Sequence, residues 1–400
     1  MVTLRAENQD HSDLRAQPAG SVLIAVSHAA DPAGAVAEIA MALKDRRPAF
    51  VLLFVPVALA SGPLCAALAR ALCDIDVFGC TTAGQISPNG YESAALIAVA
   101  FERDHFRFAS ALIEPVAPVS IADVVTQTER LAAQFPVTPG RRRLALIFAD
   151  GLSKQEDILV AALEAALKDI PVFGGSAGDE LAFRQTLILH GGAFHGNAAL
   201  LLLLETDLSF RGLGFDHFLP TEKRMVVTRA LPEERLVLEL NGAPAAREYA
   251  RLVGVPVEGL SPIVFAENPV LVRNGNNYHV RAIQQIHGTG GLTFLSAIDD
   301  GLLLTLGRGK EILRTLDAGL SVRDEAGGQP DFILGFDCYL RKLEIEHKGL
   351  RHAASDLLRR HRVVGFNTYG EQHLGVHVNQ TFVGVAFFRP GLHMTGGTVL

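Results

Sequence analysis

Cysteine is scarce in this sequence, with four residues among 400. Cys65, Cys73, Cys80 and Cys338 form no CxxC pair, no zinc-finger spacing and no CxxCH motif. This spacing excludes a cysteine-rich zinc site and a covalently attached haem. Reduced thiols are typical of the cytoplasm, and we therefore expect a cytoplasmic protein.

The sequence also lacks long hydrophobic runs. Apolar residues make up 49% of the chain, yet no run approaches the ~20 residues that span a bilayer. The first twenty residues carry charges where a signal peptide would need an apolar core. We expect no membrane segment, a flexible N-terminus over residues 1–20 and a short tail over residues 391–400.

Basic residues do not outnumber acidic ones. The chain has 36 Lys and Arg against 43 Asp and Glu, which gives a formal net charge of -7. Such a chain is not generally attracted to phosphate backbones or to anionic lipid. The densest basic cluster, Arg141 to Arg143, precedes an apolar run and is interpreted as a solvated strand entry. We expect no binding of nucleic acid.

What the chain does contain is an alternation of short apolar runs and amphipathic stretches. From Ser21 the predicted order is strand, helix, strand, helix and strand, in the segments SVLIAVSHA, PAGAVAEIAMALKD, AFVLLFVPV, CAALARALCD and IDVFGCTT. A second round starts near Arg143 with LALIFADGL, QEDILVAALEAALKD and PVFGGSAGD. Because VFGCTTAGQI and VFGGSAGDEL end equivalent strands, we predict an internally duplicated α/β region with mixed sheets.

The pattern changes near Gly214. From there to residue 390 short strands alternate with glycine turns, and two helical patterns read KEILRTLDAGL and LRKLEIEHKGLRHAASDLLRRH. A chain of 400 residues usually forms more than one domain. We therefore predict an α/β domain over residues 21–213, followed by a C-terminal α+β domain over residues 214–390.

The two repeated turns combine glycine with short hydroxyl side chains. Thr81 lies in the first turn and Ser176 in the second, and glycine lets the backbone approach a ligand closely. The turns match neither a P-loop nor a GxGxxG motif, so they are either ligand-binding loops or simple tight turns. Cys80 has no evident base beside it and is interpreted as a buried, inert thiol rather than a nucleophile.

Several longer motifs resemble FIST domain proteins, a bacterial sensory family with paired N-terminal and C-terminal FIST regions. The motifs are VFGCTTAGQI, VFGGSAGD with HGGAFHGNAALLLL, VVTRA with LELNGAPAAREY, and GFNTYGEQHLGVHVNQTFVGVAF. The resemblance covers about Ser21 to Pro390. It implies a FIST N region over residues 21–213, a FIST C region over residues 214–390, and sensing of a ligand inside the cell.

The segments FDHFLPTEKRMVVT, DDGLLLTLGRGKEIL and GFDCYLRKLEIE are similar to the nitric-oxide-sensing NosP branch of this family. This resemblance implies binding of haem b, a response to nitric oxide, and signalling to a separate histidine kinase, diguanylate cyclase or phosphodiesterase. It also allows a homodimer. The alternative that the family implies is a haem-free sensor of amino acids or other small metabolites.

A haem without a covalent link needs an axial side chain and an apolar pocket. His217 is our first candidate for the haem iron because FDHF places two aromatic residues beside it, and His347 and His377 are the next. The alternative for His217 is a loop histidine that caps nearby backbone. His373 and His377 stand four apart, but Gly375 and the adjacent valines favour a strand over a metal-binding helix.

A polar corner is predicted near the C-terminus. Tyr369, Glu371, His377 and Asn379 follow one another across a turn and a strand, which brings their side chains close. The corner either binds a polar ligand or holds the last strands together through hydrogen bonds. No nucleophile with its base and no specific metal motif accompanies it, and we therefore expect that the protein is not an enzyme.

Overall fold

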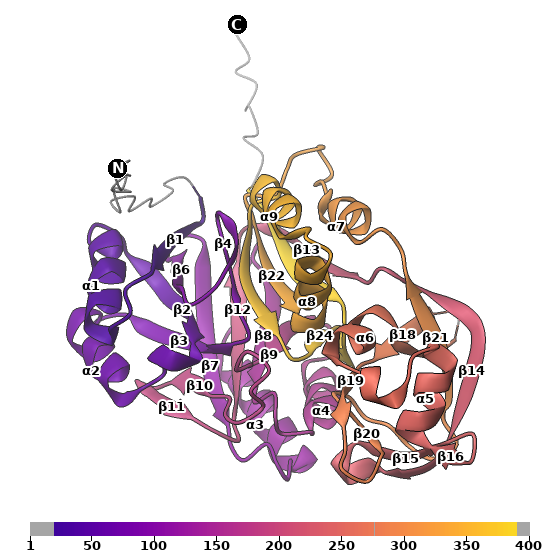
Figure 1. The fold of residues 1–400 in the computed structure, drawn as a ribbon. Helices are drawn as coiled ribbons and strands as arrows, with labels where there is room; N and C mark the ends of the chain where they lie inside the picture. The colour runs from indigo at the N-terminus through magenta and orange to yellow at the C-terminus, as the bar shows by residue number, and fades with distance from the viewer. Residues whose placement is uncertain (1–19, 276, 390–400) are drawn as a thin grey trace, which may run out of the picture.

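The computed structural model describes residues 20–275 and 277–389. Over these ranges the chain forms four β-sheets, and three of them have six strands in one common pattern (Figure 1). The predicted ends, residues 1–20 and 391–400, lie outside the described residues except for residue 20. Mixed sheets with helices packed on them confirm the predicted α/β class.

The first unit spans residues 22–102 and builds the first sheet. Strands β2 and β3 are parallel neighbours, and β6 and then β1 follow antiparallel beyond β2. The elements of this unit are β1 (Val22–Ser27), α1 (Pro32–Leu43), β2 (Pro48–Pro56), α2 (Gly62–Ala71), β3 (Asp76–Thr82), β4 (Gln85–Ser87), β5 (Gly90–Glu92) and β6 (Leu96–Glu102).

The second unit spans residues 106–206 and repeats this pattern, with β8 and β9 as the parallel pair. Strands β12 and β7 follow beyond β8, as β6 and β1 do in the first unit. Its elements are β7 (Phe106–Ile113), α3 (Ile121–Gln134), β8 (Arg142–Ala149), α4 (Glu156–Leu167), β9 (Val172–Ser176), β10 (Ile188–His190), β11 (Ala193–His195) and β12 (Ala199–Thr206).

A third unit repeats the pattern again and is made of two segments, residues 209–215 and 312–388. Strands β22 and β23 are the parallel pair, and β26 and β13 follow beyond β22. Its elements are β13 (Ser209–Phe215), α7 (Ile312–Leu320), β22 (Phe332–Cys338), α8 (Tyr339–His347), α9 (Arg351–Arg360), β23 (Val363–Thr368), β24 (Glu371–His373), β25 (Val376–Val378) and β26 (Phe382–Phe388). The predicted duplication is therefore part of a triplication.

An inserted domain, residues 218–309, interrupts the third unit between β13 and α7. It forms the fourth sheet and has its own apolar core around Tyr249 and Phe265. Residue 213, the predicted domain boundary, lies inside β13, so both sides of it belong to one sheet. The elements of the insertion are β14 (Phe218–Leu231), β15 (Leu236–Leu240), β16 (Ala243–Pro244), α5 (Ala245–Val253), α6 (Pro262–Glu267), β17 (Val270–Asn274), β18 (Asn277–Arg281), β19 (Ile283–Ile286), β20 (Leu292–Phe294) and β21 (Leu303–Gly309).

Each six-stranded sheet is completed by a hairpin from another unit. Hairpin β10–β11 of the second unit pairs with β3, β24–β25 of the third pairs with β9, and β4–β5 of the first pairs with β23. One backbone hydrogen bond recurs at all three junctions: Thr81 N to Leu187 O at 2.9 Å, Ser176 N to Gly370 O at 2.8 Å, and Asn367 N to Gly84 O at 2.8 Å. The exchange is cyclic and joins the three units into one body.

The glycine of the repeated motif has a steric role in each unit. Gly79, Gly174 and Gly365 occupy equivalent places in β3, β9 and β23. A Cβ atom at these positions would lie between 1.8 and 2.0 Å from a carbonyl oxygen of the parallel neighbour strand. No other residue type allows this approach of the two backbones.

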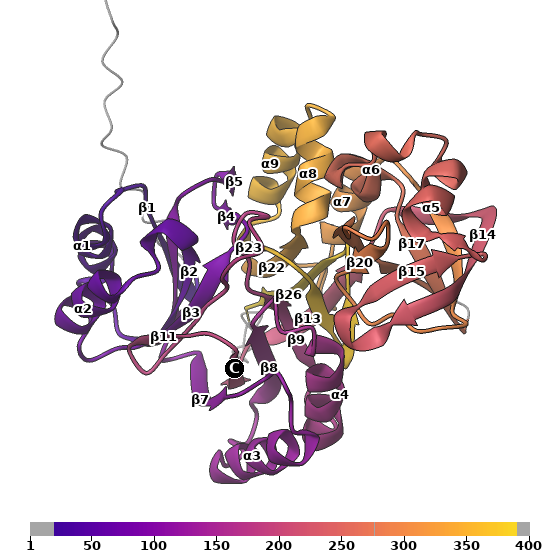
Figure 2. The ribbon, with the colours of Figure 1, turned by 60° about the horizontal axis from the view of Figure 1, so that its bottom comes forward.

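Aromatic side chains from all three sheets meet in the centre of the molecule. Phe54 of the first unit lies 6.4 Å from Phe148 of the second and 4.9 Å from Phe366 of the third, measured between ring centroids. All three rings are fully buried. Helices cover the other faces of the sheets, with α1 and α2 on the first unit and α3 and α4 on the second (Figure 2).

We predict that Gly79→Ala destabilises the fold by roughly 3 kcal/mol or more, because the added methyl group would clash with the Leu53 backbone oxygen at 2.0 Å. The control is Gly62→Ala, since nothing lies within 4 Å of a Cβ at that exposed position in α2. Urea denaturation measures both. Equal stability of the two variants would contradict the steric role of the motif glycine.

Candidate ligand site at the junction of the core and the inserted domain

A cavity of about 460 Å³ lies between the inserted domain and the third unit. Polar groups reach it from four places: Asp216 after β13, His279 in β18, Lys310 after β21 and His373 in β24. Apolar side chains supply much of the remaining wall, chiefly Phe215, Phe218, Leu219, Leu271, Val378 and Val383. Small-molecule sites are common at such interfaces between domains.

The entry and exit of the inserted domain position the charged groups. The Asp216 carboxylate accepts a hydrogen bond from the Phe218 backbone N at 2.7 Å. The Lys310 backbone N donates to the His217 backbone O at 2.7 Å, and β14 pairs with β21 beside it. A carboxylate and an ammonium group therefore approach one cavity from paired strands.

The two cavity histidines are neutral at physiological pH. Burial lowers the pKa of His373. Burial, followed by the charge of Arg281, also lowers the pKa of His279. Gly214 makes room for the His373 ring, since a Cβ atom there would lie 2.8 Å from the ring Cε1. Each neutral imidazole offers one hydrogen-bond donor and one acceptor.

His217 is fully buried and has partners for both ring nitrogens. Its Nδ1 accepts from Arg341 Nη1 at 3.0 Å, and its Nε2 donates to Glu344 Oε2 at 2.9 Å. Burial lowers the pKa of His217 despite the opposing effect of Glu344. The neutral ring therefore ties the start of the inserted domain to helix α8.

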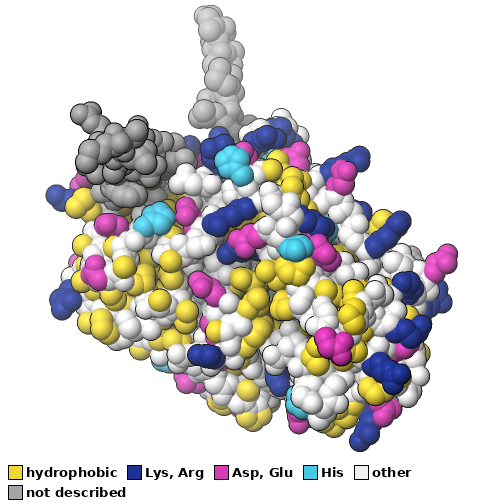
Figure 3. All heavy atoms as spheres, in the orientation of Figure 1, with side chains coloured by type: hydrophobic (Ala, Val, Ile, Leu, Met, Phe, Trp, Pro, Cys, Tyr) yellow, Lys and Arg dark blue, Asp and Glu magenta, His cyan; other side chains and the backbone are white. Residues whose placement is uncertain are grey.

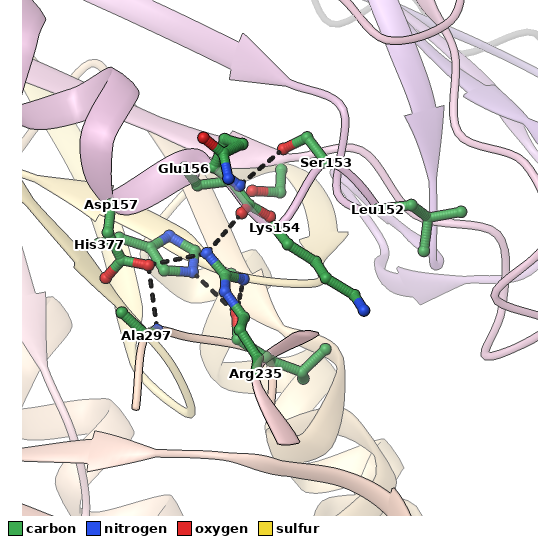
Figure 4. Close-up of polar contacts among 12 residues, drawn as sticks. Leu152, Ser153, Lys154, Glu156, Asp157, Arg235, Ala297 and His377 are labelled. Atoms are coloured by element: carbon green, nitrogen blue, oxygen red, sulfur yellow. Dashed lines mark hydrogen bonds and ion pairs between the residues drawn. The ribbon is translucent and has the colours of Figure 1, made fainter. Parts of the chain in front are cut away.

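A second polar group, here called the junction cluster, joins the inserted domain to the second and third units. Its members are Glu156 and Asp157 of α4, Arg235 and Arg281 of the inserted domain, and His377 of β25. Arg235 lies 2.8 Å from Glu156 and 2.7 Å from Asp157, and Figure 4 shows it reaching toward both carboxylates. Arg235 also donates to the Leu295 backbone O at 2.6 Å.

Opposite charges stabilise the ionised form of Asp157. Burial raises its pKa, but His377, Arg235 and Arg281 together with a hydrogen bond from the Ala297 backbone N bring the pKa below its ordinary value. Both His377 nitrogens lie near polar atoms, Nε2 at 3.3 Å from the Leu295 backbone O and Nδ1 at 3.3 Å from the Gln372 amide nitrogen. The junction cluster is thus a buried ionic contact that joins the inserted domain to the second and third units.

Several buried polar atoms around the junction cluster have no hydrogen-bond partner among the described residues. They are Arg281 Nε and Nη1, Ser296 Oγ, Gln372 Oε1 and Asn379 Nδ2. Ser296 lies between two residues that contact the cluster, and Asn379 accepts from the Ala282 backbone N at 3.4 Å. Buried polar groups are usually paired, so these atoms are the incompletely satisfied part of this contact.

The structure brings together part of the predicted polar corner. His377 lies in the junction cluster, Asn379 borders it, and Ser176 accepts a hydrogen bond from Gln372 at 2.9 Å. Gln372 is the residue that links Ser176 to His377. These predicted residues therefore share one location beneath the inserted domain.

Three other predicted ligand residues lie elsewhere. Tyr369 donates its hydroxyl proton to Asp179 and accepts from the Leu181 backbone N, so it orders the loop after β9. Thr81 accepts from the Leu187 backbone N at 3.0 Å. Glu371 neighbours Gln372 in β24 and so faces the opposite side of the strand, where Thr368 and Thr381 donate to it.

The geometry supports neither a nucleophilic Cys80 nor a metal site formed by His373 and His377. Cys80 is fully buried, and burial raises the pKa of its thiol far above the ordinary value. His373 pairs with Val376 and His377 with Gln372 across the hairpin, so the two imidazoles point to opposite faces. Within residues 20–275 and 277–389 no group of three or more potential metal ligands occurs.

The three histidines predicted for haem do not converge on a cavity. Both nitrogens of His217 and of His377 are engaged, and His347 is exposed at the end of α8. As placed, they offer no ring nitrogen inside an apolar pocket. His373 does fit the chemistry of an axial ligand, because its ring lines the apolar-walled cavity and no hydrogen bond to its nitrogens occurs among the described residues.

Comparison with family sequence models establishes the class of protein. The FIST N domain matches residues 49–243, and the FIST C domain matches residues 245–373. The two matches together cover most of the sequence, and the chain belongs to the FIST family of sensory domains found in signalling proteins. No curated protein matches the chain. In the described part of the chain, every helix is too short or too polar to cross a bilayer.

Sequence reasoning missed the charged members of the junction cluster. Glu156 and Asp157 begin helix α4, a few residues after the LALIFADGL segment, and ligand sites often form at the carboxyl ends of parallel strands. That signal was available in the sequence. Arg235 and Arg281 carry no comparable signal, because their partners lie in another unit.

We predict that Arg235→Met lowers the free energy of unfolding by about 3–5 kcal/mol, because Glu156 and Asp157 would lose their buried cation. The control Arg229→Met removes an exposed contact to Glu239 and should cost less than about 1 kcal/mol. Chemical denaturation measures both variants. If Arg235→Met lowers the free energy of unfolding as little as Arg229→Met does, the junction cluster does not stabilise the fold.

A pH-dependent stability is expected from Glu371. Burial raises its pKa to about 8, and the hydrogen bonds from Thr368 and Thr381 offset only part of this effect. An unfolded glutamate titrates near 4.5, so between these pH values only the folded state retains the proton. The free energy of unfolding therefore falls as the pH rises from about 4.5 to about 8.

Glu371→Gln cannot ionise and should remove this slope, so the variant should gain roughly a few kcal/mol on the wild type across the range. Denaturation curves at several pH values test this. Glu239→Gln, at a partly exposed position, serves as the control and should keep the wild-type slope. The assignment is wrong if Glu371→Gln keeps that slope too.

Proposed function

We propose that this protein is an intracellular sensor that binds a small zwitterionic metabolite, such as an amino acid, between its core and its inserted domain. The proposal rests on the 460 Å³ cavity between the third unit and the inserted domain. Residues of both line it, and it contains a carboxylate, Asp216, and an ammonium group, Lys310. Membership of a sensory family supports the same class of function.

The charges of the cavity match the two ends of an amino acid. The Lys310 ammonium group attracts a carboxylate, and the Asp216 carboxylate attracts an ammonium group. The neutral rings of His279 and His373 add donors and acceptors, and the apolar wall accommodates a side chain. A ligand held in this way contacts both bodies at once.

Signalling would follow from the relative position of the inserted domain. A ligand that bridges the cavity favours the closed arrangement, and it shifts the population by its difference in affinity for the two arrangements. The junction cluster and the His217 contacts already hold this arrangement without ligand. A separate histidine kinase, diguanylate cyclase or phosphodiesterase would read the surface of the inserted domain, with the protein acting as a monomer or a homodimer.

Acidic and basic side chains are mixed over the face drawn in Figure 3, and basic ones are prominent on the inserted domain at its right edge. Such a mixed surface suits a protein partner rather than a phosphate backbone. This supports a partner protein as the recipient of the signal.

The test is a thermal shift assay with the twenty amino acids. At least one of them should raise the melting temperature, and Asp216→Asn or Lys310→Met should weaken its binding about tenfold or more. The control Arg229→Met removes an exposed cation of the inserted domain that does not line the cavity. If the affinity for the stabilising amino acid is unchanged in Asp216→Asn and in Lys310→Met, the ligand does not bind at the proposed site.

We propose haem b as the second candidate ligand, on the observation that His373 lines the same cavity without a hydrogen bond among the described residues. Haem would supply an iron atom that takes nitric oxide as a ligand. The apolar wall suits the macrocycle, and Lys310 suits a propionate.

Absorption spectra after addition of hemin decide this point. Stoichiometric uptake should give a Soret band that shifts with nitric oxide, and His373→Ala should change or abolish that band. His347→Ala is the matched control, because His347 is exposed on α8. Failure of the wild type to take up hemin would leave the zwitterion as the ligand.

A further inference from the structure

A groove of about 770 Å³ lies between the inserted domain and the helices of the third unit. It is lined by Leu219 of β14 and Arg308 of β21, by residues 311–314 at the start of α7, and by Lys348 and Leu350 between α8 and α9. Only Leu219 and Lys310 also line the cavity of the proposed function. The two spaces are therefore neighbours that share part of one wall.

The groove is positively charged in a chain that is negative overall. The chain has 36 basic against 43 acidic residues, but a single carboxylate, Glu311, accompanies the four cations of the groove, which are Arg308, Lys310, Arg314 and Lys348. Lys348 is paired with Glu344 at 2.6 Å. Among the described residues, no carboxylate lies within 4 Å of the other three cations. These three can therefore bind acidic groups of another molecule.

The backbone directs cations and apolar side chains to the same side. Leu219 and Arg308 are direct partners across β14 and β21, and such partners point to one face of the sheet. Lys310 follows two residues after Arg308, and its backbone N still bonds to the residue before β14. Leu219 is 39% exposed, and Leu313 and Leu350 are only partly buried. The groove thus offers leucine side chains to a partner as well as charge.

We propose that this groove is the docking site for an acidic segment of the partner protein. Its carboxylates contact Arg308 and Arg314, and its apolar side chains pack on Leu219 and Leu313. Arginine binds a carboxylate through two parallel hydrogen bonds, and Lys310 adds a third cation. The inference rests on the proposed function in one respect, which is that the signal passes to a separate protein.

Other anions match the groove less well than an acidic peptide segment does. Inorganic phosphate would fill only a small part of 770 Å³ and would leave the leucines in water. A nucleic acid or an anionic membrane would be repelled by a net charge of -7, which three unpaired cations do not offset. A peptide with carboxylates and apolar side chains uses both kinds of groove residue, and complementary charge gives a protein interface its specificity.

Fluorescence anisotropy of a labelled peptide tests the proposal on the full-length protein. The probe is the synthetic peptide EELEELEE, which combines carboxylates with leucines. It should bind the wild type, and more weakly as the salt concentration rises. The neutral peptide QQLQQLQQ should bind about tenfold more weakly or worse, and EESEESEE several-fold more weakly. A wild type that does not bind EELEELEE overturns the proposal, and equal binding of EESEESEE overturns the apolar contact.

Substitutions in the groove locate the bound peptide. Arg308→Gln and Arg314→Gln should each weaken binding of EELEELEE several-fold, and the double variant should weaken it about tenfold or more. Both side chains are exposed, so their loss should not impair folding. Arg247→Gln is the control, because Arg247 is exposed on α5 and does not line the groove. Wild-type affinity in the double variant would overturn the site.

Sedimentation of the wild type without peptide tests a competing occupant. A dimer that dissociates in the double variant and does not bind EELEELEE would show that a second copy of the chain covers the groove. That result would refute docking of a partner segment there. A wild type that sediments identically to the double variant, and binds the peptide, supports the proposal.

The outcome is separable from that of the proposed ligand site. The double variant keeps Asp216 and Lys310, so it should retain the rise in melting temperature with an amino acid. A wild type that binds EELEELEE in the groove but responds to no amino acid would refute the ligand site and support the docking site. A response to an amino acid without peptide binding would refute the docking site alone.

Discussion

The backbone hydrogen bonds between each second parallel strand and the hairpin of another unit hold this molecule in one piece. Because β3, β9 and β23 would otherwise be open sheet edges, every unit depends on another unit to complete its sheet. The exchange also brings the three strand-end turns together. The interdomain cavity lies beside one of these junctions, since His373 and Val378 of the hairpin β24–β25 line it.

The three junctions have diverged in chemistry while keeping their backbone geometry. The hairpin of the second unit packs Leu189 and Phe194 against an apolar cluster, so that junction is structural. The hairpin of the third unit carries His377 into the ionic contact with α4, and the hairpin of the first unit borders Lys342. The inserted domain packs on the junction with His377, through Arg235 and the Leu295 backbone.

The α/β fold class and two of the three repeats could be predicted from the sequence. Each of these two repeats places VFG and a turn of small residues after a strand and a helix. The third copy, VVGFNTYG, keeps the essential glycine but replaces the Phe by Val364, and the inserted domain separates it from β13. The aromatic neighbours of His217 in the sequence suggest a haem ligand, yet its environment is set by Arg341 and Glu344, more than 120 residues away. Sequence patterns locate strands and turns well, but they do not show which distant charges meet a buried side chain.

The cyclic exchange also dictates when the protein can finish folding during synthesis. Strand β4 leaves the ribosome early, but its partner β23 is made about 280 residues later, since Ile86 pairs with Gly365. Until then the first hairpin has an unpaired edge, and the third sheet cannot close. Two of the three exchanges are missing until that point, because β24, the partner of β9, follows β23 in the chain. Premature termination before β23 therefore leaves both strand β9 and the hairpin β4–β5 with unpaired edges, which favour aggregation.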